Sequence, residues 1–410
     1  MSAITSFPKE KIQILLLENI ADKAVQGFVD AGYAQVTKLS GALDEDQLIA
    51  AIKDVHLLGI RSKTQITSKV LAHANKLLAV GCYCIGINQV DIQYATEKGI
   101  VVFNSPYPNT RSVAELVIAE AIMLLRRVPE KNAALHTGIW MKDAKNCFEL
   151  RGKTLGIIGY GNIGMQVSVL AEALGMKVIY TDVINKLPMG NARQVHQLTD
   201  LLQQSDVVSL HVPEAPSTIQ LLNAAALHLM KKGGVLINCA RGNVIDLDAL
   251  QQLITSGHIG GAAIDVFPEE PEKTGAGFSS GLQNLPNVLL TPHIGGSTEE
   301  AQINISEDVT AKLIQYLEMG VSSGSHSVPA LHLPQHPDAH RILHIHFNTP
   351  GVLSEINAVL SAGDVNIVGQ YLNTNNKIGY AVIDVSKNLQ TQTIEALRNV
   401  KHTIKMRVVY

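Results

Sequence analysis

Short apolar runs alternate with amphipathic segments through the first hundred residues of the chain. Runs that predict buried strands cover residues 12–17, 55–60, 77–80 and 101–103, and helical patterns cover residues 21–31 and 44–52. This alternation is typical of a parallel sheet with helices on both faces. A longer helix is predicted from Asn109 to about Arg127, with Asn109 or Thr110 as the N-cap.

The same alternation starts again at residue 155 and continues to residue 291. The apolar runs that predict strands there are residues 155–158, 178–182, 207–212, 235–238, 262–266 and 288–290. A further helical pattern follows at residues 299–317. We therefore expect an α/β fold with two doubly wound parallel sheets of the Rossmann or flavodoxin type.

The pattern changes in the last ninety residues. Residues 320–337 are rich in Gly, Ser, Pro and His and predict a linker. Beyond them, strands are predicted at 340–347, 365–373, 379–385 and 403–409, and helices at 350–361 and 391–399. Pro350 is expected in the first turn of its helix. The order βαββαβ indicates a small ferredoxin-like domain.

A glycine-rich turn joins the strand at residues 155–158 to the helical pattern that follows it. Gly159 allows a tight turn, Gly161 lets the backbone approach a pyrophosphate, and Gly164 lets the helix pack on the strand. Asp182 ends the next strand, where a carboxylate accepts hydrogen bonds from ribose hydroxyls and repels a 2′-phosphate. Such turns also occur without a ligand, but these flanking elements favour an NAD site rather than an NADP site.

Three side chains suited to catalysis follow the last three predicted strands. Arg241, Glu270 and His293 stand beyond those strand ends, where ligands of open α/β sheets bind. Arg241 can grip a carboxylate with two parallel N–H bonds. His293 can take a hydroxyl proton as hydride leaves the same carbon, while Glu270 would orient the imidazole and favour its charged form. Each residue alone could be purely structural, but together they favour oxidation of a 2-hydroxy acid.

Composition excludes several other classes of protein. The 410 residues suffice for two to three domains, and a net charge of −3 indicates neither a nucleic-acid nor a membrane partner. No secretory signal is visible, and the apolar stretch at residues 114–125 is too short to span a bilayer. Four cysteines without C-x-x-C spacing point to a reducing cytoplasm. Six of the fifteen histidines fall between His326 and His346, but without acidic or cysteine partners, so we expect no metal site.

Together these motifs resemble the NAD-dependent D-2-hydroxyacid dehydrogenases. The resemblance rests on the glycine-rich turn and on residues 209–213, 238–242, 265–267 and 292–293. It implies that Arg241, Glu270 and His293 are the catalytic set and that Asp265 faces the nicotinamide carboxamide. Besides the three glycines, it implies NAD contacts at Asn162, Ile163, Asp182, Cys239, Ala240, Arg241, Asp265, His293, Ile294, Gly295 and Gly296.

Residues 58–62, 81–86, 88–91 and 109–115 are similar to a short bacterial branch of that family. The branch oxidises 3-phospho-D-glycerate to 3-phosphohydroxypyruvate, the first step of L-serine synthesis. It implies a substrate-binding domain (1–108 and 300–332), an NAD domain (109–299) and an ACT domain (339–410). It also implies substrate contacts at Arg61, Ser62, Asn109, Lys142 and Gln302. Lys142 would act near a neighbouring subunit's site, or could equally be an exposed loop charge.

The C-terminal βαββαβ unit resembles an ACT domain through residues 344–346, 350–353 and 365–367. The resemblance implies a homotetramer with paired ACT domains that L-serine inhibits by binding His346, Asn348 and Asn366. Phe347 and Thr349 flank Asn348 where relatives carry a charged pair. Two other functions stay open: a dehydrogenase or reductase for another 2-hydroxy acid, such as 2-hydroxyglutarate, and a non-catalytic NADH-sensing regulator.

Overall fold

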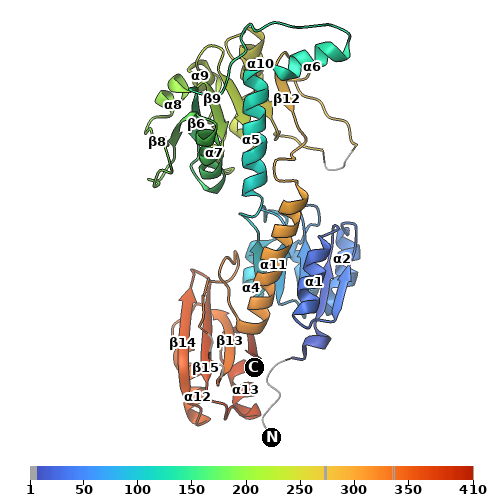
Figure 1. The fold of residues 1–410 in the computed structure, drawn as a ribbon. Helices are drawn as coiled ribbons and strands as arrows, with labels where there is room; N and C mark the ends of the chain where they lie inside the picture. The colour runs from blue at the N-terminus through green and yellow to red at the C-terminus, as the bar shows by residue number, and fades with distance from the viewer. Residues whose placement is uncertain (1–6, 272–274, 335, 337, 410) are drawn as a thin grey trace. The chain divides into compact units, whose positions relative to one another are not determined.

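The computed structural model describes residues 7–271, 275–334, 336 and 338–409. The contacts divide the chain into two units, and Figure 1 labels several of their elements. The first unit combines the described residues of Met1–Pro108 and Gln302–Tyr410, and the second is formed by those of Asn109–Ala301. The division into three domains stays a prediction, because the ACT-like residues are grouped with the N-terminal residues here.

The N-terminal part of the first unit contains a five-stranded parallel sheet with the order β2-β1-β3-β4-β5, the flavodoxin-like arrangement. Its strands are β1 (Gln13–Leu16), β2 (Gln35–Lys38), β3 (Leu57–Ile60), β4 (Ala79–Cys82) and β5 (Val101–Asn104). Its helices are α1 (Asp22–Asp30), α2 (Glu45–Ala51), α3 (Ser68–His73) and α4 (Ile92–Glu97). The apolar pattern missed β2, because this edge strand has no fully buried residue.

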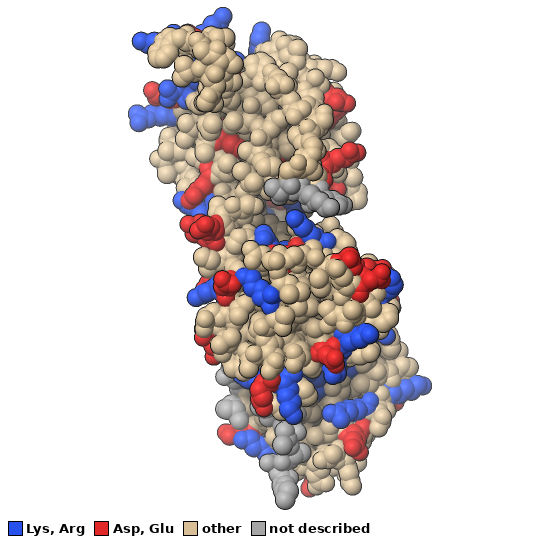
Figure 2. Space-filling model, turned by 90° about the vertical axis from the view of Figure 1, so that its right-hand side faces the viewer, with Lys and Arg blue, Asp and Glu red and all other residues tan. Residues whose placement is uncertain are grey.

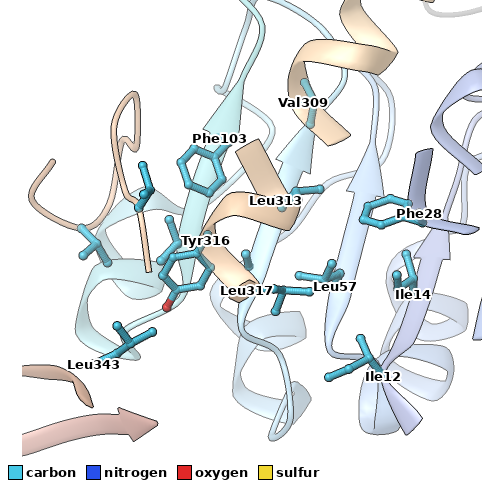
Figure 3. Packing of buried hydrophobic residues seen from close by; sticks show 14 of the residues in the cluster. Ile12, Ile14, Phe28, Leu57, Phe103, Val309, Leu313, Tyr316, Leu317 and Leu343 are labelled. Atoms are coloured by element: carbon cyan, nitrogen blue, oxygen red, sulfur yellow. The ribbon is translucent and has the colours of Figure 1, made fainter. Parts of the chain in front are cut away.

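Both faces of this first sheet are buried, as its continuous apolar strands predict. One face packs against α2, α3 and α4. The other packs against α1 and α11 (Glu299–Met319), a helix from a distant part of the sequence. Figure 3 shows Val309, Leu313 and Leu317 of α11 beside the strand residues Phe103 and Leu57. The first unit therefore needs the segment after residue 302 to complete its core.

The second unit contains a seven-stranded parallel sheet with the order β12-β11-β10-β9-β6-β7-β8. Its strands are β6 (Thr154–Ile158), β7 (Lys177–Thr181), β8 (Arg193–Gln194), β9 (Val207–Leu210), β10 (Val235–Asn238), β11 (Gly261–Ile264) and β12 (Val288–Leu290). Its helices are α5 (Thr110–Leu125), α6 (Val128–His136), α7 (Asn162–Ala173), α8 (Leu198–Gln204), α9 (Ala224–His228) and α10 (Leu247–Thr255). The strand order reverses beside β6, where doubly wound sheets bind nucleotides.

Helices cover both faces of the second sheet. α5 and α7 bury one face, and α8, α9 and α10 bury the other. Asn109 stands at the N-cap of α5, but its side chain makes no capping hydrogen bond. The prediction of a capping side chain was wrong, because Asn109 has φ −94° and ψ 3° instead of the extended backbone that usually aims an N-cap side chain at the helix.

The C-terminal part of the first unit is a four-stranded antiparallel sheet with the order β14-β15-β13-β16. Its elements are β13 (His340–Phe347), α12 (Val352–Ala362), β14 (Ile367–Thr374), β15 (Ile378–Val385), α13 (Thr391–Arg398) and β16 (Thr403–Val409). This arrangement confirms the predicted ferredoxin-like βαββαβ order. The placement of Pro350 was wrong, because α12 begins at Val352 after Gly351, whose φ of +96° forms the turn into the helix.

Each face of the antiparallel sheet has a different partner. Apolar side chains of α12 and α13 pack on one face, and those of α11 pack on the other, where Figure 3 shows Leu343 near Tyr316. A fully buried ion pair joins Arg341 to Asp384 through bonds of 2.6 and 2.7 Å. The sheet is thus part of the same packed unit as α11.

The segment after α11 is attached to the first sheet, so the expectation of a solvated linker was wrong. The hydroxyl of Ser327 donates to Ile100 O at 2.7 Å, and the ring of His326 contacts Asn104 Oδ1 at 2.9 Å. Ser327 therefore binds a backbone carbonyl just before β5 of the first sheet, and His326 binds a side-chain amide of that strand. Gln335 and Pro337, which the predicted linker included, lie outside the described residues.

Charged side chains of both signs are present on the surface. Figure 2 shows Lys and Arg interspersed with Asp and Glu on the face in view. Among the described residues, no helix is long and apolar enough to cross a membrane. The same residues include no group of three or more His, Cys, Asp or Glu side chains that could hold a metal ion.

Candidate active site and cofactor site

The glycine-rich turn between β6 and α7 has the geometry of a phosphate-binding loop. Gly159 has φ +93°, and a Cβ atom there would lie 2.5 Å from His211 O. A Cβ on Gly164 would lie 2.4 Å from Gly159 O, whereas nothing lies within 4 Å of a Cβ on Gly161. The first and third glycines are therefore required by the protein's own packing. The second leaves open space before the N-terminus of α7, where a pyrophosphate fits.

Asp182 lies at the end of β7 and holds the same turn. Its Oδ2 atom accepts a hydrogen bond from Tyr160 N at 2.8 Å, and its Oδ1 atom accepts one from Ile184 N at 3.1 Å. The Tyr160 ring stacks on Tyr180 of β7 with 3.8 Å between centroids. A carboxylate has about four acceptor positions, so Asp182 retains capacity for ribose hydroxyls. Together with the open space at Gly161, this arrangement fits NAD.

Glu270 and His293 are brought together, as the sequence predicts. Glu270 Oε2 lies 2.8 Å from His293 Nδ1, and Glu270 Oε1 accepts a hydrogen bond from Phe267 N at 3.0 Å. Because Glu270 engages Nδ1, Nε2 is the ring nitrogen left for a substrate. His293 has φ +54°, a left-handed conformation that is uncommon outside glycine and concentrated at functional sites.

Asp265 holds the turn that carries His293. This residue is 1 % exposed. Its carboxylate accepts hydrogen bonds from the Thr291 hydroxyl at 2.6 Å and from the N–H groups of Ile294 and Gly295 at 2.8 Å each. Its backbone carbonyl accepts from His293 N at 2.8 Å. The family resemblance implied that Asp265 contacts the cofactor. The structure shows that Asp265 also positions the His293 turn, a role that the sequence did not predict.

Arg241 follows β10 at the neighbouring strand end. Its Nη1 atom donates to Ala240 O at 2.6 Å, and no hydrogen bond joins it to Glu270 or His293 among the described residues. A Cβ on Gly242 would lie 2.0 Å from the Phe267 carbonyl carbon. The turn that carries Arg241 therefore lies directly against the segment that leads to Glu270, and Nε and Nη2 remain for a carboxylate.

The residues expected to contact substrate are divided between the two units. In the second unit, Asn109 is buried against Gly296, and its Oδ1 atom has no hydrogen-bond partner among the described residues. Lys142, in the same unit, is exposed. In the first unit, Arg61 and Ser62 follow β3, and Gln302 lies half-buried on α11. The contacts of these side chains with substrate stay a prediction.

The three predicted serine contacts do not meet within one chain. His346 lies in β13 opposite Gly379 of β15, and Asn348 follows that end of β13. Asn366 precedes β14, whose first residue pairs with the last residue of β15. At about 3.3 Å per residue, Asn348 and Asn366 stand at opposite ends of the sheet, roughly 20 Å apart.

Comparison with known proteins identifies the family. Residues 118–295 match the model of the D-isomer specific 2-hydroxyacid dehydrogenase NAD binding domain, and residues 342–405 match an AHAS small subunit-like ACT domain. D-3-phosphoglycerate dehydrogenases of Haemophilus influenzae and Escherichia coli are 49% and 50% identical to this chain over 410 residues, covering all of both chains. The chain belongs to the D-isomer specific 2-hydroxyacid dehydrogenases.

A solved structure supports the cofactor of this 2-hydroxyacid dehydrogenase. The chain has a TM-score of 0.65 to D-lactate dehydrogenase from Aquifex aeolicus complexed with NAD and lactic acid, with 26% identity, 78% of this chain covered and 100% of that one. This chain is therefore an NAD-dependent enzyme that acts on a small-molecule substrate. Its ACT domain suggests regulation by a ligand. The non-catalytic regulator is thereby set aside.

Sequence reasoning missed one buried acid of this dehydrogenase. Glu120 of α5 is 2 % exposed, its Oε2 atom accepts a hydrogen bond from the Cys239 thiol at 3.4 Å, and its Oε1 atom has no partner among the described residues. The pKa of the Glu120 carboxyl is raised from 4.5 to about 7, mainly by burial, which outweighs the lowering by the Cys239 hydrogen bond and is supported by the nearby charge of Asp265. A glutamate inside an apolar helix pattern was the available signal.

Replacing Glu120 with glutamine should stabilise the fold at alkaline pH. Because the pKa of Glu120 is higher in the folded than in the unfolded state, ionisation of this carboxyl destabilises the fold. This destabilisation is absent below pH 4.5, grows as the pH rises towards 7 and is constant above that. At 1.36 kcal/mol per pKa unit, Glu120→Gln should gain at most about 3 kcal/mol at pH 8 and little at pH 4.5. Urea unfolding of both proteins at the two pH values measures this, and an equal effect at both would contradict it.

Proposed function

We propose that this dehydrogenase oxidises 3-phospho-D-glycerate to 3-phosphohydroxypyruvate with NAD, the first step of L-serine synthesis. The observation that carries the proposal is the match over all 410 residues to proteins named D-3-phosphoglycerate dehydrogenase, at 49% and 50% identity. The match includes the ACT-like residues as well as the catalytic unit. A cytoplasmic location is part of the proposal and agrees with four free cysteine thiols.

The residues of the second unit supply the acid–base chemistry. Arg241 binds the substrate carboxylate through Nε and Nη2, because Nη1 is held by Ala240 O. His293 Nε2 takes the proton of the C2 hydroxyl, and Glu270 holds the imidazole by its Nδ1 atom. When bound, NAD would supply the acceptor for the hydride that leaves C2. In the reverse direction, the protonated His293 returns the proton to the carbonyl oxygen.

A phosphorylated substrate needs a second cation, and Arg61 is our candidate. It follows β3, is half-buried, and its guanidinium makes no hydrogen bond or ion pair within the described residues. An arginine free of internal partners is available for a phosphate, which it binds with charge-assisted hydrogen bonds. Ser62 is exposed beside it and adds a hydroxyl donor.

Replacing Arg61 with alanine should therefore penalise phosphorylated substrates selectively. We expect kcat/KM for 3-phospho-D-glycerate to fall about 30-fold, since a hydrogen bond to a charged group contributes about 2 kcal/mol. The value for D-glycerate should change little. Steady-state kinetics of both proteins, with the exposed neighbour Lys63→Ala as control, measures this difference. An equal loss on all the acids, or wild-type preference for an unphosphorylated acid, would favour the alternative 2-hydroxyacid dehydrogenase.

The effector site supports an oligomer. His346 and Asn348 lie at the opposite end of the antiparallel sheet from Asn366. A single L-serine molecule can contact both sets only if two copies of the chain bring opposite ends of their sheets together. We propose that paired ACT domains bind L-serine in this way within a homotetramer and that serine inhibits the enzyme.

Hybrid enzymes can test whether two chains share the serine site. His346→Ala and Asn366→Ala should each lose inhibition by L-serine, because each removes one half of every site. Co-expressed, the two variants should regain part of the inhibition, because some sites in the hybrids combine both intact halves. Asn357→Ala, on α12, is the matched control and should keep wild-type inhibition. Hybrids as insensitive as the single variants would contradict a shared site.

A further inference from the structure

The Glu18 carboxylate binds three backbone N–H groups of the loop that carries Arg61. Its Oε1 atom accepts from Arg61 N at 3.2 Å and from Thr64 N at 2.8 Å, and its Oε2 atom accepts from Lys63 N at 3.0 Å. Glu18 follows β1 and is 8 % exposed. An acid at the end of one strand thus fixes the loop at the end of the neighbouring strand.

The other side of the Arg61 peptide is held as well. Gln89 Nε2 donates to Arg61 O at 2.7 Å, and the Cys84 thiol donates to the same oxygen at 3.5 Å. Both the N–H and the C=O of Arg61 are therefore fixed by side chains from other segments. This leaves the Arg61 side chain as the free part of the residue.

The Glu18 carboxylate has the arrangement of an anion in a backbone nest. Backbone N–H groups that converge on one point form a binding site for anions. Here the donors are the N–H groups of Arg61, Lys63 and Thr64, and the anion is a side chain of the protein itself. No cation is paired with Glu18 among the described residues. Since a buried charge without a partner is costly, the three N–H donors are its compensation.

Glu18 also has an unfavourable backbone conformation. Its φ is +60° and that of Asn19 is +51°, in the left-handed region that costs an ordinary residue about 1 kcal/mol or more. The backbone is kept there by bonds from Glu18 N to Gly41 O at 3.0 Å and from Asn19 N to Leu39 O at 3.1 Å. Glycine would fit this conformation more easily, so a glutamate here indicates a need for its carboxylate.

We propose that Glu18 is a positioning residue for substrate binding. It fills the nest of N–H groups and holds the Arg61 loop so that the guanidinium is presented to the substrate phosphate. The inference rests on the proposed function, because it takes Arg61 as the phosphate contact. It adds a residue that never touches the substrate but sets affinity for the phosphorylated acid through the loop backbone.

Two substitutions of Glu18 separate this role from a general structural one. Glu18→Gln keeps the shape and one acceptor oxygen, and Glu18→Ala empties the nest. Because the loss of binding that substrate and transition state share raises KM and leaves kcat unchanged, we expect KM for 3-phospho-D-glycerate to rise about 3-fold in Glu18→Gln and about 10-fold or more in Glu18→Ala. The KM for NAD should stay near wild type, and added formate should lower the raised KM of Glu18→Ala by occupying the empty nest.

Two further variants make the outcome decisive. Asp44→Ala removes another carboxylate of the first unit that caps backbone, at Gln47 N, and should keep the wild-type KM. Arg61→Ala tests the proposed function: an unchanged KM there contradicts the phosphate contact itself. If Arg61→Ala raises KM but both Glu18 variants do not, the inference about Glu18 alone is overturned. Loss of folded protein in both Glu18 variants, with Asp44→Ala normal, assigns Glu18 to folding and also overturns it.

Discussion

Replacing His293 with alanine should lower kcat by at least about 100-fold while the protein still binds NADH. The loss is the usual scale for removing a general acid or base. The geometry supports this assignment, because Glu270 engages His293 Nδ1 at 2.8 Å and leaves Nε2 for the substrate hydroxyl. The glycine-rich turn and Asp182, which we expect to bind the cofactor, lie on other strand ends and are untouched by the change.

Steady-state kinetics and a fluorescence titration with NADH measure the two halves of this prediction. His228→Ala is a matched control, because His228 is an exposed histidine of the same unit whose Nδ1 atom contacts Ala224 O in its own helix. The control should turn over normally. Turnover of His293→Ala near the wild-type rate would show that the proton acceptor is another group.

Replacing Arg241 with lysine should lower kcat/KM by about 100-fold or more, although the charge is kept. Lysine is a single-point donor and cannot form two parallel bonds to a carboxylate. The Nη1 atom of Arg241 is already held by Ala240 O at 2.6 Å, so the guanidinium is aligned before substrate binds. Lysine loses that alignment too, and the substrate C2 carbon is then poorly placed for hydride transfer.

The pattern across substrates distinguishes Arg241 from Arg61. All 2-hydroxy acids share the carboxylate, so Arg241→Lys should reduce kcat/KM for phosphorylated and unphosphorylated acids alike. Arg61→Ala should reduce it for the phosphorylated acid only. Arg193→Lys, at the exposed start of β8, is a control for the conservative change. A wild-type kcat/KM in Arg241→Lys would contradict the carboxylate-binding role.

The fold was predictable where strands are buried on both faces. The continuous apolar run at residues 235–238 located β10, whose four residues are all buried, and the apolar run at residues 288–290 also located β12, although this edge strand is only partly buried. The edge strands β2 and β8 were missed, because their sequences, QVTK and RQ, are mostly polar and leave no apolar run to detect. Cap details failed for a different reason: they depend on the backbone angles of Asn109 and Gly351, which the apolar pattern does not report.

The candidate site was predictable in its residues but only partly in its contacts. Arg241, Glu270 and His293 were chosen as candidates because carboxyl ends of parallel strands gather at one edge of a sheet, and the structure brings Glu270 and His293 together. The positioning roles of Asp265 and Glu18 were not predicted from the sequence. The hydrogen-bond partners of these carboxylates are backbone N–H groups of neighbouring loops, and the path of those loops decides which groups lie within reach. Glu18 follows a buried strand just as Arg61 does, so the same rule could have marked it.

The most direct test of the central claim is NADH formation from 3-phospho-D-glycerate. Purified enzyme, NAD and this substrate should produce NADH absorbance at alkaline pH in the presence of a reagent that traps the keto product. Unphosphorylated 2-hydroxy acids should give a much lower kcat/KM. A protein that binds NADH normally yet forms no NADH from 3-phospho-D-glycerate, while oxidising another 2-hydroxy acid efficiently, would contradict the account.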